Sequence, residues 1–142
     1  MADVHSKEAR SYNMSRIPNK NTKPEIIVRK YLFAKGFRYR LHDRKLPGSP
    51  DIVLPKFRTV IFINGCFWHG HENCKYAAIP KTRTAWWEAK IKKNIFNDEM
   101  ARSRLTEGGW KIIVIWGCEL KPKVETATLN DVAETIIANS LD

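Results

Sequence analysis

The chain has 142 residues, of which 43% are hydrophobic and 28% are charged. This composition is typical of one soluble globular domain with a single core, and it excludes a disordered or fibrous chain. No apolar run is long enough to span a membrane, and the N-terminal segment lacks the apolar centre of a signal peptide, so we expect a cytoplasmic protein.

The formal net charge is +10, and the positive charge is concentrated in the N-terminal part. Residues 1–50 contain 12 Lys and Arg against 4 Asp and Glu, whereas residues 105–142 contain 3 against 6. A one-sided excess of this kind favours a polyanion partner, because each phosphate that is neutralised releases counterions. A solvated basic surface with no specific partner would have the same charge, so charge alone does not establish nucleic-acid binding.

The first half of the chain predicts one helix followed by short strands. Residues 1–21 are polar and basic without periodicity, which indicates a flexible arm. Thr22 and Glu25 have the spacing of a capping box for a helix that ends at Gly36. The segments expected as strands are 37–41, 51–54 and 58–64, with 55–57 as the connection between the last two.

The second half predicts helix, strand and helix. Apolar residues recur at helical spacing from Thr84 to the glycine pair that begins at Gly108. Residues 110–116 form a continuous apolar run, typical of a strand that is buried on both faces. Asn130 is the expected N-cap of the last helix. This order of elements predicts an α/β fold with a mixed central sheet flanked by helices, in one domain that covers residues 1–142.

The decapeptide GCFWHGHENC (65–74) carries the clearest chemical signal. Cys66, His71 and Cys74 have spacings suited to a metal, and Cys118 can supply a fourth ligand. A Cys₃His set is typical of a closed, tetrahedral, structural zinc site. His69 also fits the spacing as the histidine ligand, and buried free thiols beside a surface histidine are the alternative interpretation.

Asp51 follows Pro50 at the start of an expected strand. If the strand 58–64 returns antiparallel, its end lies near this carboxylate. Mg²⁺ keeps most of its waters and takes one or two protein oxygens, so Asp51 is a candidate ligand. A histidine that is not bound to zinc, His69, would suit proton transfer near neutral pH. The alternatives are a turn-forming aspartate and an idle surface histidine.

Five segments together resemble the very-short-patch-repair (Vsr) endonucleases of bacteria. They are MADVHSKEARSYNMS, LPGSPDIV, VIFINGCFWHGH, KTRTAWWEAKIKKN and GWKIIVIWGCEL, which extend over about residues 1–120. The resemblance implies a restriction-endonuclease-like core with a structural zinc. It also implies Mg²⁺-dependent nicking of one DNA strand, 5′ of the thymine at T:G mismatches that arise when 5-methylcytosine deaminates.

The resemblance also implies roles for individual residues. Asp51 matches the Mg²⁺-binding aspartate, and the main-chain carbonyl of Ile63 matches the second protein ligand. His69 matches the histidine that activates water. The remaining matches are Asp98 as the support of that histidine, Glu25 as an active-site glutamate, Cys66, His71, Cys74 and Cys118 as zinc ligands, and Met14, Phe67, Trp68 and Trp87 as side chains that enter the DNA stack.

This sequence departs from the family pattern at two places. Position 64 is Asn, where family members commonly have a second active-site histidine. Asn64 can donate a hydrogen bond to a phosphate oxygen but cannot transfer a proton, so the acid/base work would fall to His69. Two residues separate His71 from Cys74 where the better-known pattern has one, which should alter the loop but not the number of ligands.

A zinc site would explain why bulky rings share a loop with metal ligands. A stiff loop can hold Phe67 and Trp68 out as a wedge, and stacking on a base returns about 1–3 kcal/mol against the cost of opening a base step. Core packing is the alternative for these rings, above all for one of the pair Trp86 and Trp87. Glu25 could likewise serve only as the capping-box residue.

Three functions remain open at this stage. They are a mismatch endonuclease, a non-catalytic zinc-stabilised DNA-binding module, and a zinc hydrolase with an open metal. Asp51 favours the first over the second, and Cys118, which would close the zinc shell, favours it over the third. For the endonuclease we expect a monomer, double-stranded DNA with a T:G mismatch as the substrate, and mismatch-repair proteins as candidate partners. A related endonuclease with a different DNA target is a further alternative.

Overall fold

The computed structural model describes residues 22–140 and contains a four-stranded mixed sheet. The strands are β1 (Arg40–Leu41), β2 (Ile52–Leu54), β3 (Thr59–Asn64) and β4 (Lys111–Trp116), in the order β1-β2-β3-β4. β1 and β2 are antiparallel, as are β2 and β3, whereas β3 and β4 are parallel. The prediction of an α/β fold with a mixed sheet is therefore confirmed.

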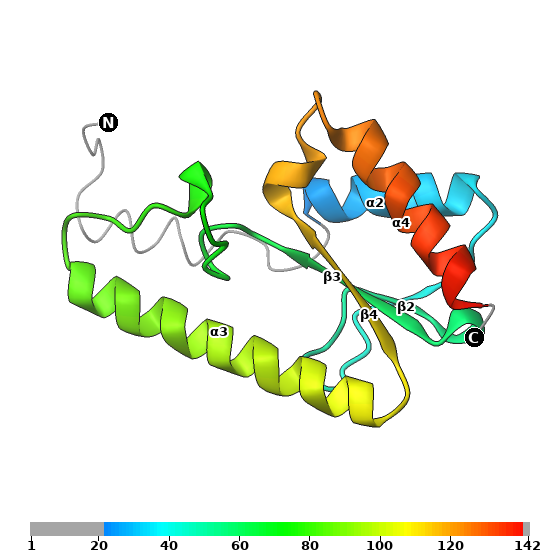
Figure 1. Cartoon of the computed structure of the whole chain (residues 1–142), viewed down its shortest axis with the longest axis horizontal. Coiled ribbons are helices and arrows are strands. Elements are labelled where there is room, and N and C mark those ends of the chain that lie inside the picture. Colours follow the sequence, from blue (N-terminus) through cyan, green and yellow to red (C-terminus); the bar gives the residue numbers. More distant parts are fainter. Residues whose placement is uncertain (1–21, 141–142) are drawn as a thin grey trace.

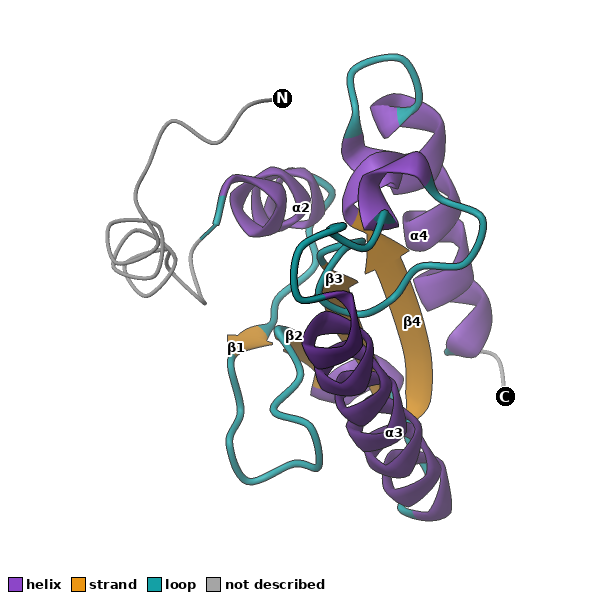
Figure 2. Ribbon diagram, turned by 90° about the vertical axis from the view of Figure 1, so that its left-hand side faces the viewer, coloured by secondary structure: helices purple, strands orange, loops and turns teal. Residues whose placement is uncertain are grey.

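Helices cover both faces of this sheet (Figures 1 and 2). α2 (Lys23–Ala34) and α4 (Glu125–Asn139) lie on one side, and the long α3 (Thr84–Glu107) lies on the other. α3 forms the crossover between the parallel strands β3 and β4, which is how two parallel neighbours must be joined. Three short 3-10 turns complete the described chain: η1 (Pro55–Phe57), η2 (Lys75–Ala77) and η3 (Gly117–Leu120).

Successive side chains along each strand point to opposite faces of the sheet, and this produces two separate apolar cores. Side chains of β2 point alternately to the two sides, so Ile52 and Leu54 pack with α2 and α4, whereas Val53 packs toward Leu105 of α3. The larger core contains Val28, Leu32, Ile61, Ile115, Val132 and Ile136, and the smaller contains Val53, Val60 and Leu105. Because both faces are covered, the cleft described below can form only at an end of the sheet.

The structure corrects several local expectations. Thr22 is the N-cap of α2, but its side chain makes no capping hydrogen bond, and Glu25 bonds to Arg29 and His42 instead. α4 begins at Glu125, so Asn130 lies inside the helix, where its Oδ1 accepts a hydrogen bond from Tyr31. Glu25 and Asn130 thus form hydrogen bonds with other side chains in place of the expected capping bonds.

Two strand expectations also change in detail. Only Arg40–Leu41 of the expected strand 37–41 pairs with β2. In β4, Ile115 is buried but its neighbours are only half-buried, so full burial of 110–116 on both faces was wrong. β4 lies at the end of the strand order in the described chain, which leaves one of its edges without a neighbouring strand.

The expected arm 1–21, and with it Met14, lies outside the described residues. Within residues 22–140 no helix combines the length and the apolar character that crossing a bilayer requires.

Candidate active site and metal cluster

An open cleft of about 900 Å³ lies at the end of the sheet where β3 finishes. The start of α2, the loop before β2, the end of β3 and one side of α3 form its walls. Six residues that the sequence analysis placed in the active site line it: Glu25, Asp51, Ile63, Asn64, His69 and Asp98. Segments separated by up to 73 positions in the sequence thus contribute to one site.

Pro50 and Asp51 together end the β2–β3 ladder in an unusual way. The carboxylate Oδ2 of Asp51 accepts the N–H of Ile63 at 2.7 Å, which a main-chain carbonyl would accept in a regular ladder. The β2–β3 register, extended by two residues, places Pro50 opposite Ile63. N–H and C=O of one strand residue point to the same neighbour, and proline has no N–H to donate. The carbonyl of Ile63 therefore faces Asp51 without a donor from Pro50.

Burial raises the pKa of the Asp51 carboxyl above its usual range. The amide of Ile63 lowers this pKa, the neighbouring Glu25 raises it, and His42 and His69 lower it. A half-buried carboxylate beside a second carboxylate is a place where added positive charge is stabilised. Asp51 and the carbonyl of Ile63 thus form an oxygen pair that suits a hard divalent cation.

His69 and Asp98 form a close pair inside the cleft. Nδ1 of His69 lies 2.6 Å from Oδ2 of Asp98, and both side chains are about one-quarter to one-third exposed. An ionised carboxylate only accepts hydrogen bonds, so Nδ1 carries the proton and Nε2 is left as an acceptor when the imidazole is neutral. This is the tautomer that can take a proton from a water in the cleft.

Glu25 is nearly buried, with 4% of its surface exposed. Its Oε2 accepts from Nη2 of Arg29 at 2.8 Å and lies 3.0 Å from Nε2 of His42. The ligand atoms of Glu25, His42 and Asp51 all lie within 4.8 Å of one another. Sequence reasoning missed Arg29 and His42, because neither belongs to a recognisable motif and His42 stands in a turn far from Glu25 in the chain.

Asn64 lies at the last position of β3 and lines the cleft with only 5% of its surface exposed. Among residues 22–140 its side-chain amide has no hydrogen-bond partner. A nearly buried amide that faces a cleft is suited to bind a polar group that enters there.

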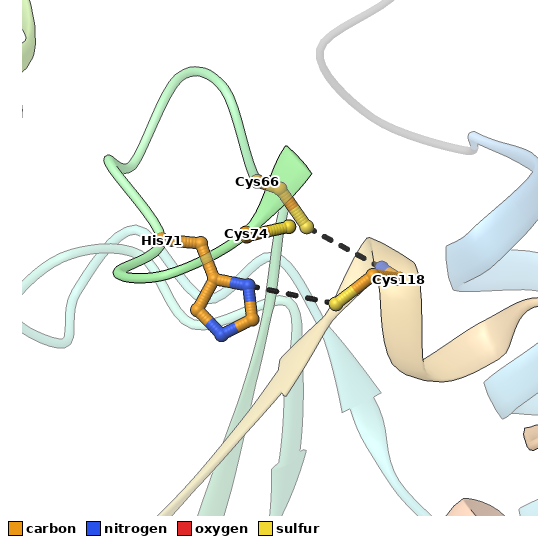
Figure 3. A group of neighbouring side chains, drawn as sticks. All are labelled: Cys66, His71, Cys74 and Cys118. Atoms are coloured by element: carbon orange, nitrogen blue, oxygen red, sulfur yellow. Dashed lines mark hydrogen bonds between the residues drawn. The ribbon is translucent and has the colours of Figure 1, made fainter. Parts of the chain in front are cut away.

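A second cluster lies just beyond β3 and β4 (Figure 3). Asn64 pairs with Trp116 in the parallel register, so two residues further on Cys66 and Cys118 come opposite each other. The loop after β3 folds back and brings His71 and Cys74 to the same point, and the ligand atoms of the four residues lie within 4.8 Å of one another. The structure thus gathers His71, and not His69, with the three cysteines.

The geometry of this cluster fits a tetrahedral metal. Two ligand atoms, Sγ of Cys118 and Nδ1 of His71, lie 3.5 Å apart. Separately, the amide N–H of Cys118 donates a hydrogen bond to Sγ of Cys66 at 3.4 Å. A tetrahedron with metal–ligand bonds of about 2.0–2.3 Å has edges of about 3.3–3.8 Å. The imidazole of His71 is further held by stacking on Trp116, with the ring centres 4.1 Å apart.

The electrostatics of the thiols also favour a cation in this cluster. Burial, together with the neighbouring Cys66 and Cys74, raises the pKa of the Cys118 thiol to about 12. The pKa of Cys74 is lowered by hydrogen bonds from its neighbours, although burial acts against this. Three thiols in one place cannot all ionise without a cation among them, so this donor set is suited to a soft or borderline metal ion.

Four aromatic rings pack together beside the cleft, apart from the two sheet cores. Phe67 lies 5.2 Å from Trp68 and 5.3 Å from Trp87, measured between ring centres, and Trp68 lies 5.8 Å from Trp87. Trp68 is 36% exposed and lines the cleft, and its carbonyl accepts a hydrogen bond from Asn94. Trp86 packs edge-on against Trp87 and is 47% exposed.

Comparison with known proteins identifies the family. Residues 2–75 match the family model described as DNA mismatch endonuclease Vsr. The chain is 50% identical over 123 residues to the type II nicking enzyme V.NmeAIP of Neisseria meningitidis, covering 87% of each chain. It is 46% identical over 120 residues to the type II nicking enzyme V.XorIIP of Xanthomonas oryzae pv. oryzae, covering 84% of this chain and 88% of the relative.

A third relative is the DNA mismatch endonuclease Vsr of Escherichia coli, which is 44% identical over 121 residues, covering 85% of this chain and 77% of the relative. The matches to these three relatives each extend over 84–87% of this chain. The chain belongs to the Vsr family of DNA mismatch endonucleases.

Proposed function

We propose that this protein is a Mg²⁺-dependent, strand-specific endonuclease that nicks DNA 5′ of the thymine at T:G mismatches, such as those left by deamination of 5-methylcytosine. One observation carries the proposal: a single open cleft contains Asp51, the carbonyl of Ile63 and the His69–Asp98 pair. These are an oxygen pair for a metal and a proton acceptor with its supporting carboxylate, which hydrolysis of a phosphodiester requires.

Asp51 and the main-chain carbonyl of Ile63 would hold Mg²⁺. The bound ion supplies a Lewis acid that polarises the scissile phosphate and lowers the pKa of water. His69, oriented by Asp98, accepts the proton of the attacking water through Nε2. Asn64 donates a hydrogen bond to a phosphate oxygen from the floor of the cleft, and Glu25 orients the water shell beside Asp51.

The cluster of Cys66, His71, Cys74 and Cys118 is proposed to hold a structural zinc ion. All four tetrahedral positions would be filled by protein atoms, which leaves no position for substrate or water. Together with the mixed sheet and the metal-binding aspartate at its edge, this supports a restriction-endonuclease-like core. The zinc would fix the loop from which Phe67 and Trp68 project.

The aromatic cluster is proposed as the mismatch reader. Phe67, Trp68 and Trp87 enter the base stack, and Met14 of the arm 1–21 enters from the minor groove. A T:G wobble pair is easier to distort than a Watson–Crick pair, so insertion costs less there. Packing among the rings limits the ordering entropy lost when they enter the stack.

The same proposal covers partners and organisation. Residues 1–142 act as one domain and as a monomer on double-stranded DNA, in the bacterial cytoplasm, with mismatch-repair proteins as candidate partners. The strongest rival is an endonuclease of this family with a different DNA target, because two of the relatives are named type II nicking enzymes. A non-catalytic DNA-binding module would not need the His69–Asp98 pair, and an open-zinc hydrolase would not need Cys118.

The decisive assay uses duplexes labelled on either strand that carry T:G, T:A or C:G at one position, with Mg²⁺ or with EDTA. We expect one nick, 5′ of the mismatched thymine, in the presence of Mg²⁺ and none in EDTA. Cleavage of the T:A duplex at an equal rate would instead favour a nicking enzyme with a different target. Absence of cleavage on every duplex would favour the DNA-binding module.

A further inference from the structure

The Glu25 carboxylate is held by two side chains from different parts of the chain. Arg29 lies one helical turn further along α2 and donates to Oε2 at 2.8 Å. His42 lies in the turn between β1 and β2, and its Nε2 lies 3.0 Å from the same oxygen. A nearly buried carboxylate loses most of its water, and these two contacts replace hydrogen bonds that water would otherwise make.

The geometry identifies the protonated nitrogen of His42. An ionised carboxylate and an arginine have fixed roles, one only accepting and the other only donating. Nε2 of His42 is 3.0 Å from Glu25 and 3.4 Å from Nη2 of Arg29. The shorter contact is to the acceptor, so Nε2 carries a proton and donates it to Glu25.

His42 is also bound to the residue that precedes β2. Its backbone N–H donates to the carbonyl of Asp51 at 3.2 Å. One residue therefore contacts both carboxylate-bearing segments of the cleft, through its side chain on one and its main chain on the other.

The backbone of His42 is strained, with φ at +46°. This left-handed region is uncommon for residues other than Gly, and among the others Asn, Asp and His enter it most often. The contacts of its side chain with Glu25 and of its main chain with Asp51 hold it in this conformation.

We propose that His42 is a positioning residue, whose Nε2–H fixes the Glu25 carboxylate beside Asp51. The inference rests on the proposed role of Glu25 in the cleft. His42 itself is not among the residues that line the cleft, so it acts through Glu25 and not on the substrate.

Direct metal ligation by His42 is the competing interpretation, because its nitrogen lies within reach of the Glu25 and Asp51 oxygens. The guanidinium of Arg29 argues against it, since this permanent positive charge lies 3.4 Å from the same nitrogen and would repel a cation there. The proton on Nε2 would also have to leave first.

The test uses His42→Gly and His42→Gln in the full chain. Glycine suits the positive φ but removes the donor, so the metal-free protein should stay folded at the assay temperature, as its melting curve will show. The kcat for nicking should fall about 10- to 100-fold, as is typical when an outer partner of a site is lost. Glutamine carries an N–H donor and should restore kcat to within a few-fold of the wild-type value. Duplex affinity measured in EDTA should be unchanged in both variants.

Asp43→Ala is the matched control, because Asp43 lies in the same turn and, among residues 22–140, its carboxylate accepts only a local hydrogen bond from the amide of Lys45. It should retain wild-type kcat. A spectroscopic readout is independent of activity: ¹⁵N-edited NMR of the metal-free protein should show a protonated Nε2 on His42, and this signal should change in Glu25→Ala.

Each outcome has one meaning. Wild-type kcat in His42→Gly, beside an inactive Glu25→Ala, would overturn the positioning role alone. Unfolding of His42→Gly at the assay temperature, with no recovery of kcat in His42→Gln, would show that His42 is merely structural. Full activity of Glu25→Ala would overturn the role of Glu25 and this inference with it. If His42→Gln lowers the affinity of the EDTA-treated protein for Mn²⁺, His42 is a metal ligand instead.

Discussion

Two clusters of potential ligands lie within a few residues of each other at one end of the sheet, and they differ in almost every respect. The Cys66–His71–Cys74–Cys118 cluster consists of soft or borderline donors that converge on one point. The Asp51 region consists of hard oxygens at the wall of an open cleft, with Arg29 as a cation nearby. The first is suited to hold an ion permanently and the second to exchange waters and substrate.

The difference shows how a single strand end can serve two purposes. β3 delivers Ile63 and Asn64 to the cleft, and Cys66 directly afterwards to the soft cluster. A metal bound at Cys66, as proposed above, would restrain the loop that carries the cleft residues Trp68 and His69. Substitutions in the Asp51 region should therefore reduce activity more than stability, and substitutions in the cysteine cluster should do the reverse.

The largest effect on activity is expected from a substitution in the Asp51 region. Asp51→Ala removes a proposed Mg²⁺ ligand, and a metal is worth several kcal/mol of transition-state stabilisation, so nicking should fall at least about a thousandfold. The fold should remain, since the carboxylate is half-buried and not part of either apolar core. Single-turnover nicking and circular dichroism measure the two effects, and a well-folded variant with substantial Mg²⁺-dependent cleavage would contradict the assignment.

The largest effect on stability is expected from a substitution in the cluster of Cys66, His71, Cys74 and Cys118. Cys118→Ser should release the metal and destabilise the domain by several kcal/mol, a large part of a typical stability of about 5–15 kcal/mol. Atomic absorption measures zinc per chain and thermal unfolding measures stability. Glu72→Ala is the control, because Glu72 is exposed in the same loop but does not belong to the cluster. One full equivalent of zinc in Cys118→Ser would mean that Cys118 is not a ligand.

Within the cleft, proton transfer should matter more than a hydrogen bond. His69→Ala removes the proposed base and should reduce nicking about 10²- to 10⁴-fold. Asn64→Ala removes one hydrogen bond to a phosphate and should cost about tenfold. Single-turnover rates of the two variants under identical conditions decide the comparison. If Asn64→Ala is the more damaging, the proposed division of labour is wrong.

A smaller and more selective effect is expected from the ring at the cleft. Trp68→Ala should weaken binding to a T:G duplex by about 10- to 100-fold, corresponding to roughly 1–3 kcal/mol of stacking. Binding to a matched duplex should change less, because phosphate contacts serve both. Trp86→Ala, which removes an exposed ring outside the cleft lining, should affect both duplexes alike. Equal losses for Trp68→Ala on the two duplexes would argue against insertion.

The smallest effect is expected at Pro50, which lies opposite Ile63 and has no N–H to donate to its carbonyl. Pro50→Ala introduces an N–H that can bond to the Ile63 carbonyl, so the Mg²⁺ concentration for half-maximal nicking should rise by up to about tenfold. Pro47→Ala is the control, because it also replaces a proline and so changes the entropy of the unfolded chain in the same way. Pro47 lies two residues before the cleft-lining Ser49, and its replacement should leave the Mg²⁺ requirement unchanged. An unaltered Mg²⁺ titration in Pro50→Ala would mean that the carbonyl is not a ligand.

Much of the fold followed from local patterns in the sequence. The long helix from Thr84 and the strand before Gly65 have strong periodicity or a continuous apolar run, and both formed as expected. The spacing of Cys66, His71 and Cys74 indicated a metal cluster, because three of its four members stand in one loop. Local sequence suffices where the deciding contacts are local.

Tertiary contacts decided the rest. Glu25 was expected to cap its own helix and Asn130 to begin another, yet each found a partner distant in sequence, His42 and Tyr31 respectively. The spacings favoured His71 as the ligand but left His69 open, and only the fold of the loop turned His69 toward Asp98 and His71 toward Cys118. The sequence by itself determined which donors are available and which segments are helix or strand. Only the packed structure determined which donors meet, because polar side chains exchange weak local hydrogen bonds for distant partners whenever burial removes water from them.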